Sequence, residues 1–584
     1  MKTLSGLDAT FLYLETPETP MHVGSLHLYD LPKGFKGSFH SAVTEHMAGR
    51  IHLSPIFTRK LAFMPFNLGH PHWVDDENFD IENHIVKIGK TYKGKTVTEQ
   101  MAQDIAASLH GELIDRNRPL WIFTVFDSIL RNNGERCAGF YSKIHHAALD
   151  GKGGTVLANS VLDVSEVPRD VPKPKPAQQS KAPDVKMGEM ISAVLSNSLA
   201  QYAKLAKSLP AAAAQIGNSL AKNGLPLSAQ KASDFKAPSP LNLAPKTLFN
   251  VAIGAERVFV TASLPFAECR TMAKTLDASF NDMVLWICAT ALRSYLAQHA
   301  EIPAKSLIAA MPVSLRDESS QTGNESAGNQ ASMSLANLGT HIAHPIKRMQ
   351  AIMVSTAKVK KAMVSLKSVL PTDYPGLLAP LLVGGAAKLA FKAYGNTNIA
   401  ERLPLLANVV ISNVPGPQVP LYLAGARMMT FHPLSIVMHG LGVNFTIQTY
   451  AGRVDFGIIA ADNALPHAQD LADAVVAAFE EARGLYALGQ AAAVKEAGKG
   501  TLKSALKRAV KGTVKQTVKT PVKAISKSKA KAKTPVTTAL TTPAKKRVSP
   551  ATKKLAVASK SPIEKAATLA GKSRPAETKA NAAR

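Results

Sequence analysis

The sequence predicts an α/β protein with two folded domains and a basic C-terminal tail. Its 584 residues are too many for one ordinary domain. Strand-like and helix-like patterns alternate on both sides of a segment rich in proline and lysine. Of the net charge of +27, +21 falls on residues 491–584, so the remainder carries a near-ordinary +6. We therefore expect two domains, a linker between them and a tail of different character.

The composition shifts place the boundaries. We expect an N-terminal domain at 1–165, a linker with a helical segment at 166–246, a C-terminal domain at 247–488 and a low-complexity tail at 489–584. The linker begins with prolines interleaved with lysines, which favour a stiff, solvated chain. Its middle is rich in Ala, Leu and Ser, which is typical of a helix.

In the first domain, alternation or helical spacing predicts each element. We expect strands at 21–28, 121–126 and 138–144, and helices at 39–50, 97–109 and from 156 onward. Asn133-Gly134 lies between the last two strands and is a typical hairpin turn. The strand that ends at Ile144 leads directly into a stretch rich in reactive side chains.

That stretch is His145-His146-Ala147-Ala148-Leu149-Asp150-Gly151, an HHxxxDG pattern between a predicted strand and a predicted helix. A neutral imidazole can accept a proton at physiological pH if its ring is held in one orientation. We therefore interpret His146 as a general base and Asp150 as a structural carboxylate. A rigid strand followed by a loop suits an exposed catalytic side chain.

Two other interpretations of this stretch remain open from the motif alone. A purely structural histidine pair is a serious alternative, because a seven-residue pattern is only moderately specific. A metal site is poorly supported, since adjacent histidines point apart and no further ligand has convincing spacing. The sequence has no G-x-S-x-G, Walker A or G-x-G-x-x-G motif, which argues against a serine hydrolase, a P-loop NTPase or a dinucleotide enzyme.

The second domain repeats the alternation of strands and helices. We expect strands at 257–264, 307–315, 409–413, 442–449 and 454–460, and helices at 266–276, 281–298 and 466–484. Asn281 and Asp282 are both plausible residues for a helix N-terminus, and Asn281 is a candidate N-cap.

Composition excludes several classes. Three cysteines without CxxC spacing argue against a disulfide framework or a zinc site. The N-terminus does not resemble a signal peptide, and no apolar run reaches the roughly 18 residues that span a bilayer. The nearest run, Gly376–Ala387, is interpreted as a buried helix, with an apolar patch facing lipid as the alternative.

The tail repeats lysine every four residues from Lys495 to Lys527. A four-residue step drifts by about 40° on a helix, so no single basic face persists. Thr, Gly and Pro also oppose a long helix, and we expect disorder. Such a tail can bind polyanions through counterion release, but it has no aromatic residues for base stacking.

With these features in place, the chain resembles the bacterial wax ester synthase/acyl-CoA:diacylglycerol acyltransferases, within the CoA-dependent acyltransferase superfamily. The resemblance covers roughly residues 1–485 without the linker and rests on HHxxxDG and five further landmarks in order. These are Leu4-Ser5-Gly6-Leu7-Asp8, Pro119-Leu120-Trp121, Asn281-Asp282, Pro312-Val313-Ser314-Leu315-Arg316 and Asn413-Val414-Pro415-Gly416-Pro417. The basic tail is not part of the family pattern.

The resemblance implies two similar domains, each a mixed sheet with flanking helices, and an acyl transfer from acyl-CoA to diacylglycerol or a fatty alcohol. By carry-over His146 is the general base, His145 shapes the loop, and Asp150 is structural beside Gly151. Asn281, Asp282 and Arg316 are expected to support the site, with Arg316 the candidate partner of Asp150. No metal and no cofactor are expected, because acyl-CoA is a substrate.

Two further hypotheses differ in acceptor or in class. The acceptor could be a polyketide or a peptide on a carrier protein, or the chain could bind granules or nucleic acid through its tail. We also expect a cytoplasmic protein that associates peripherally with the inner membrane or lipid inclusions, without a transmembrane span.

Overall fold

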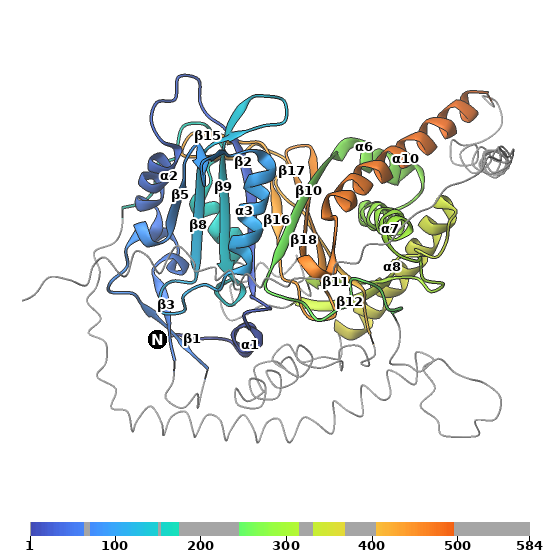
Figure 1. The fold of residues 1–584 in the computed structure, drawn as a ribbon, viewed down its shortest axis with the longest axis horizontal. Helices are drawn as coiled ribbons and strands as arrows, with labels where there is room; N and C mark the ends of the chain where they lie inside the picture. The colour runs from blue at the N-terminus through green and yellow to red at the C-terminus, as the bar shows by residue number, and fades with distance from the viewer. Residues whose placement is uncertain are drawn as a thin grey trace, which may run out of the picture. The chain divides into compact units, whose positions relative to one another are not determined.

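The computed structural model describes residues 2–63, 70–149, 153–173, 244–314, 331–367 and 405–495. All of them belong to one compact unit. Two large mixed sheets with flanking helices form its framework, which confirms the predicted fold class (Figure 1). The Gly376–Ala387 run, residues 174–243 of the linker and the tail beyond Lys495 lie outside the described residues.

The first sheet has the strand order β14-β15-β2-β9-β8-β5, and β16 also pairs with β2. Its neighbours are antiparallel except for the parallel pair β5 and β8. The strands contributed by the N-terminal half are β2 (His22–Asp30), β5 (Ile85–Ile88), β8 (Trp121–Leu130) and β9 (Arg136–His145).

The hairpin of β8 and β9 confirms the predicted Asn-Gly turn. Gly134 has a φ of +85°, a conformation that costs glycine least. The N–H of Arg131 donates to the carbonyl of Glu135 at 2.8 Å and closes the turn. The hairpin fixes the register, so β9 ends at His145 directly opposite His22 of β2.

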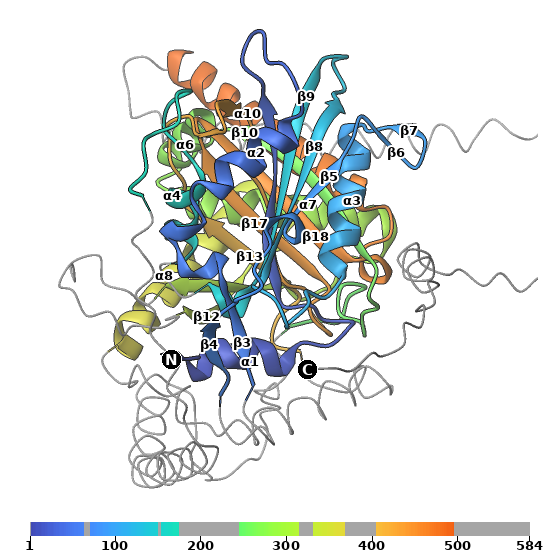
Figure 2. The same ribbon diagram turned by 90° about the vertical axis from the view of Figure 1, so that its left-hand side faces the viewer.

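Helices cover both faces of this sheet (Figures 1 and 2). Side chains of α2 (Phe39–Ala48) bury against Tyr29 and Phe123. Side chains of α3 (Glu99–Gly111) bury on the opposite face with Leu26 and with residues of the second sheet. The face under α3 is therefore where the two halves of the chain share a core.

The second sheet has the order β10-β18-β17-β13-β11-β12. Strand β13 lies parallel to both of its neighbours, and the remaining pairs are antiparallel. The strands are β10 (Arg257–Pro265), β11 (Ile308–Ser314), β12 (Ala331–Asn337), β13 (Val409–Val414), β17 (Val443–Tyr450) and β18 (Arg453–Ala461).

The helices of the second half are α6 (Phe266–Thr275), α7 (Phe280–His299), α8 (Pro345–Lys367) and α10 (Ala468–Lys495). Helix α7 is apolar on nearly every side because it is buried among the others. The expectation that Asn281 is its N-cap is wrong. Ser279 caps it, and the N–H of Ser279 donates to the carboxylate of Asp282 at 2.9 Å, which completes a capping box.

A segment of the second half of the chain crosses over and joins the first sheet. The predicted boundaries, 1–165 and 247–488, do not anticipate this crossing. Strands β14 (Tyr422–Leu423), β15 (Ala426–Met428) and β16 (His432–Leu434) extend the first sheet, with β15 and β16 pairing with β2. The N–H of Phe431 donates to Asp455 of β18 at 2.8 Å. The crossing segment therefore connects the two sheets. The domain boundaries stay a prediction.

One helix and two small sheets lie in the N-terminal part of the chain outside the two large sheets. Helix α1 (Gly6–Leu14) is capped by Ser5, whose hydroxyl accepts from the N–H of Asp8. Strands β1 (Lys2–Thr3), β4 (His72–Asp75) and β3 (Arg59–Ala62) form a three-stranded sheet, and β6 (Thr91–Tyr92) pairs with β7 (Lys95–Thr96). Helix α1 contacts the turn that follows β9.

The crossing strand leaves no room for a side chain at Gly457. A Cβ there would overlap the backbone carbonyl oxygen of Pro433 in β16. We predict that Gly457→Ala lowers the free energy of unfolding by about 1–3 kcal/mol through overpacking. The matched change Gly484→Ala, in open space on α10, should raise it by about 0.5–1 kcal/mol. Thermal unfolding of both variants checks this, and equal midpoints would contradict the close approach.

Candidate active site

The two histidines of the motif lie at the point where β9 ends. His145 is the last residue of the strand, and His146–Ala148 form one turn of 3-10 helix. The N–H of His146 donates to the carbonyl of Met21 at 2.8 Å, which fixes the start of the turn against the entry to β2. The predicted strand-to-loop position of the histidines is confirmed.

His145 is fully buried and holds the turn rather than facing a substrate. Its Nδ1 accepts a hydrogen bond from the N–H of Ala147 at 3.0 Å. A neutral ring that accepts at Nδ1 carries its proton on Nε2. That Nε2 lies 3.3 Å from Oε1 of Glu15, within ion-pair distance but without the geometry of a hydrogen bond.

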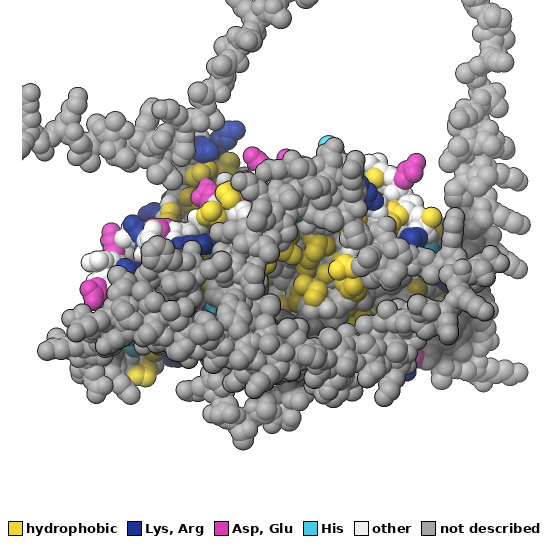
Figure 3. All heavy atoms as spheres, turned by 90° about the horizontal axis from the view of Figure 1, so that it is seen from below, with side chains coloured by type: hydrophobic (Ala, Val, Ile, Leu, Met, Phe, Trp, Pro, Cys, Tyr) yellow, Lys and Arg dark blue, Asp and Glu magenta, His cyan; other side chains and the backbone are white. Residues whose placement is uncertain are grey.

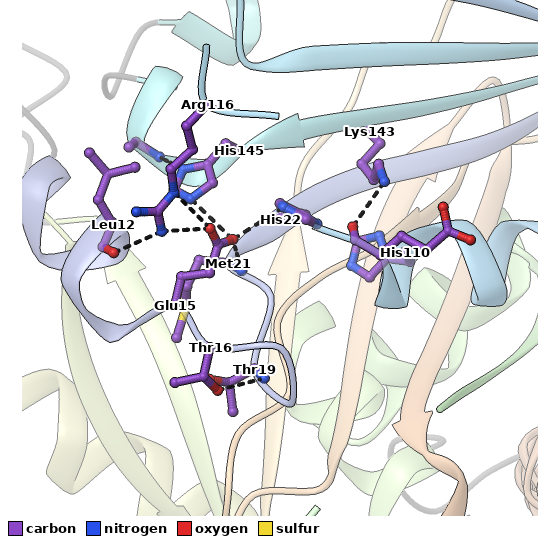
Figure 4. Close-up of polar contacts among 12 residues, drawn as sticks. Leu12, Glu15, Thr16, Thr19, Met21, His22, His110, Arg116, Lys143 and His145 are labelled. Carbon is purple, nitrogen blue, oxygen red and sulfur yellow. Dashed lines mark hydrogen bonds and ion pairs between the residues drawn. The ribbon is translucent and has the colours of Figure 1, made fainter. Parts of the chain in front are cut away.

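Glu15 is the carboxylate on which this region converges (Figure 4). It ends helix α1, and its side chain is almost fully buried. Its Oε1 accepts from the N–H of Met21 at 3.0 Å and lies 3.2 Å from Nε2 of His22. Its Oε2 accepts from Nη2 of Arg116 at 2.7 Å. One carboxylate thus joins α1, β2, β9 and the loop before β8.

Met21 connects this carboxylate to His146 through one residue. Its N–H donates to Glu15, and its carbonyl accepts from the N–H of His146. The backbone of the second histidine is therefore positioned two hydrogen bonds away from Glu15. Arg116 also donates to the carbonyl of Leu12, which ties the same loop to α1.

Burial and close contacts shift the pKa values of the charged groups in this cluster. Burial alone would raise the pKa of Glu15, but the contacts with His145 and His22 hold it far below its ordinary range. Burial lowers the pKa of His22 to about 4, and Lys143 adds to this by repulsion. The pKa of Lys143 itself falls to about 8, chiefly because of burial. At neutral pH Glu15 is therefore an anion, and Nη2 of Arg116 lies 2.7 Å from it in an ion pair.

His146 differs from His145 in its surroundings. Its ring stacks on Phe11 of α1, with 3.9 Å between ring centroids and 16° between planes. Burial lowers its pKa to about 4, while its own backbone carbonyl acts in the opposite direction. No other described residue holds its Nδ1. His146 is thus neutral at physiological pH, oriented by stacking, and free of the contacts that occupy His145.

Asn281 and Asp282 have different roles in the structure. Asp282 is buried, completes the capping box of α7 and accepts from the hydroxyl of Thr356 of α8 at 2.7 Å. Its carboxylate is thereby fully engaged in joining helices. Asn281 accepts from Nδ2 of Asn413 at 3.3 Å, so two of the sequence landmarks meet. Among the described residues, neither Asn281 nor Asp282 has a hydrogen bond or ion pair with His145 or His146.

Asp150, Gly151 and Arg316 lie outside the described residues. Their roles, including the pairing of Asp150 with Arg316, stay predictions. Within the described part of the chain, no group of three or more His, Cys, Asp or Glu side chains is arranged to hold a metal ion. Catalysis without a metal or a cofactor likewise remains a prediction.

Sequence reasoning missed Glu15, His22, Arg116 and Phe11. Nothing local marks Glu15, because it follows a helix in a stretch of threonines and prolines. Arg116 is 101 residues away from it along the chain. The usable signal was the strand containing His22: pairing it with the strand that ends at His145 places the two histidines face to face.

The chain matches a known protein family along most of its length. A family model described as wax ester synthase/diacylglycerol acyltransferase catalytic domain matches residues 4–284, and the WS/DGAT C-terminal domain matches residues 327–483. The chain belongs to the wax ester synthase/diacylglycerol acyltransferase family. It is accordingly an O-acyltransferase by family, and its HHxxxDG loop lies within the matched catalytic domain.

Individual relatives support the assignment of this acyltransferase. The O-acyltransferase WSD of Acinetobacter baylyi is 31% identical over 81% of this chain and 94% of its own. The probable diacylglycerol O-acyltransferase tgs2 of Mycobacterium tuberculosis is 30% identical over 80% and 95%. A solved wax ester synthase/diacylglycerol acyltransferase from Marinobacter aquaeolei VT8 shares the fold, with a TM-score of 0.56 at 24% identity over 82% of this chain and 98% of that one.

None of the described helices of the acyltransferase is both long and apolar enough to span a membrane.

We predict that Glu15→Gln slows turnover while the protein stays folded. Loss of the charge leaves Arg116 without its carboxylate and loosens the support of Met21 and His146. Misplacement of a catalytic group by about 1 Å can cost roughly 10²-fold, so kcat should fall by about tenfold to 10²-fold. Glu45→Gln, at an exposed site on α2, is the matched control. Unchanged kcat in Glu15→Gln, measured as CoA release, would contradict the positioning role.

The pH profile should report the depressed pKa of His146. Because the base acts unprotonated, kcat/KM should stay flat from pH 8 to pH 5 and fall only near pH 4. Phe11→Ala removes the stacked ring and hydrates the imidazole, which raises its pKa toward about 6.5. The acid limb should then move to higher pH. An inflection near pH 6.5 in the unaltered enzyme, with the fold intact by circular dichroism, would refute this assignment.

Proposed function

We propose that this enzyme transfers a long-chain acyl group from acyl-CoA to a lipid hydroxyl. With diacylglycerol the product is triacylglycerol, and with a fatty alcohol it is a wax ester. The observation that carries the proposal is His146: a neutral imidazole at the end of β9, stacked on Phe11 and separate from the ion-pair network behind it. The names of the relatives supply the acceptor classes.

The reaction needs one base and no covalent intermediate. A nitrogen of neutral His146 takes the proton of the alcohol, and the oxygen attacks the thioester carbonyl carbon. The tetrahedral intermediate collapses, the C–S bond breaks, and the CoA thiolate takes the proton back from the imidazolium. The thioester is already activated, so an acyl-enzyme would add nothing. General base help of this kind is worth about 10²–10⁴-fold.

The depressed pKa of His146 is compatible with this role. All of the imidazole is in the basic form at neutral pH. Negative charge that develops on the reacting oxygens stabilises the imidazolium, and this raises the effective pKa as the reaction proceeds. The fixed backbone of His146 keeps the ring in place through the cycle, so both proton transfers use the same group.

Apolar substrates fit the surroundings of the histidines. Figure 3 shows hydrophobic side chains gathered on the described part of the face seen from below, the side on which α1 and β1 lie in Figure 1. Side chains of α1 such as Leu12 belong to an apolar cluster that includes Ala147 of the histidine turn. Acyl chains and lipid alcohols gain free energy by leaving water for apolar side chains that are exposed on this face.

The remaining roles belong to the same proposal. In this proposal Asp150 pairs with Arg316 to hold the loop after His146, and Asn281, which accepts a hydrogen bond from Asn413, supports the site. The enzyme works at the cytoplasmic surface of the inner membrane or of lipid inclusions, where its lipid acceptors are found. The basic tail adds attraction to polyanions.

Removal of the proposed base is the direct test. We predict that His146→Ala lowers the rate of CoA release from palmitoyl-CoA by about 10²–10⁴-fold with either hexadecanol or diacylglycerol. His341→Ala, at an exposed histidine before α8, is the matched control and should keep full activity. Ester products are identified by chromatography. Full activity of His146→Ala would show that another group is the base.

A further inference from the structure

Helix α8 has an unusual composition for its length. Its 23 residues include no Asp or Glu and six basic side chains, at positions 347, 348, 358, 360, 361 and 367. It packs against α7 and the edge strand β12 of the second sheet (Figure 1). It lies in the half of the chain that does not contain the histidine turn.

The inner face of α8 packs against the rest of the second half of the chain. Met349, Ile352 and Thr356 are buried. Arg348 is only 2% exposed, donates to the carbonyls of Ile342 and Ala343, and lies over the ring of Trp286. This arginine therefore belongs to the core contacts and not to the surface.

The outer face is a stripe of Lys347, Val354 and Lys358. These residues are seven and four positions apart, which places them along one line of a helix. All three are exposed, and Val354 keeps 57% of its surface in solvent. A single exposed valine is ordinary on a protein surface, and between two lysines it also suits an interface that is charged outside and apolar within.

The described part of the chain does not neutralise the lysines of this stripe. Among the described residues, Lys347 and Lys358 have no acidic partner within ion-pair distance, whereas Arg348 lies 3.9 Å from Glu481. Lysines near an anionic lipid surface are attracted to it without needing a specific partner. The stripe is consequently complementary in charge to such a surface.

We propose that the outer stripe of α8, defined by Lys347, Val354 and Lys358, docks this enzyme on an anionic phospholipid surface. The lysines contact the headgroups, and Val354 enters the boundary with the acyl chains. Lipid is favoured over nucleic acid because α8 contains no aromatic residue for base stacking and presents an apolar side chain at the centre of the stripe. The proposal deepens the proposed function, since it names the surface by which the enzyme reaches its lipid acceptors.

The docking test uses the full chain without substrates, so its failure is separate from failure of the proposed activity. Binding is measured by flotation with vesicles of phosphatidylglycerol and phosphatidylcholine, and with phosphatidylcholine alone. A lysine near an anionic surface contributes roughly fivefold in affinity. The variant K347Q/K358Q should therefore bind the anionic vesicles about 25-fold more weakly, and Val354→Ser should weaken binding further.

The matched control is K33Q/K36Q, which removes the same charge from an exposed loop after β2. It should change vesicle binding far less than K347Q/K358Q, and both variants should keep turnover of a water-soluble short-chain acceptor. Equal losses in the two variants would show that total charge or the tail binds the lipid, and would overturn the proposal. So would undiminished vesicle binding by K347Q/K358Q, or a loss confined to binding of duplex DNA.

Discussion

The carboxylate of Glu15 is the constraint on which the candidate site depends. A buried anion is costly unless it is paired and hydrogen-bonded. Glu15 meets this requirement through Arg116, Met21 and two imidazoles. These partners come from separate parts of the chain, so the carboxylate holds those parts together. Loss of the Glu15 charge would leave the guanidinium of Arg116 without its carboxylate and weaken the support of Met21.

The carboxylate of Glu15 gives the two histidines of the motif separate tasks. His145 is committed to Glu15 and to the N–H of Ala147, and it shapes the turn. His146 keeps its ring for chemistry, with Phe11 stacked against it. The same helix, α1, supplies both Glu15 and Phe11 at its C-terminal end. Its orientation therefore sets the position of the carboxylate and of the stacked ring together.

Part of the fold around the candidate site could be predicted from the sequence. Alternation and turn chemistry located the β8–β9 hairpin, and with it the end of the strand at His145. Asn281 and Asp282 both suit a helix N-terminus, but Ser279 lies three residues before Asp282, has the spacing of a capping box and is the N-cap of α7. Glu15 and the crossing strands β14 to β16 could not be found, because their partners lie far away in the chain and their segments are too short for a periodic signal.

The central claim is that Glu15 acts on catalysis through the position of His146, and a double-mutant comparison tests it most directly. The CoA-release rates of His146→Ala, Glu15→Gln and the combined variant are measured under one set of conditions. If Glu15 acts through His146, the combined variant is no slower than His146→Ala alone. If the two losses multiply, Glu15 contributes independently of the base, and this account of the site is contradicted.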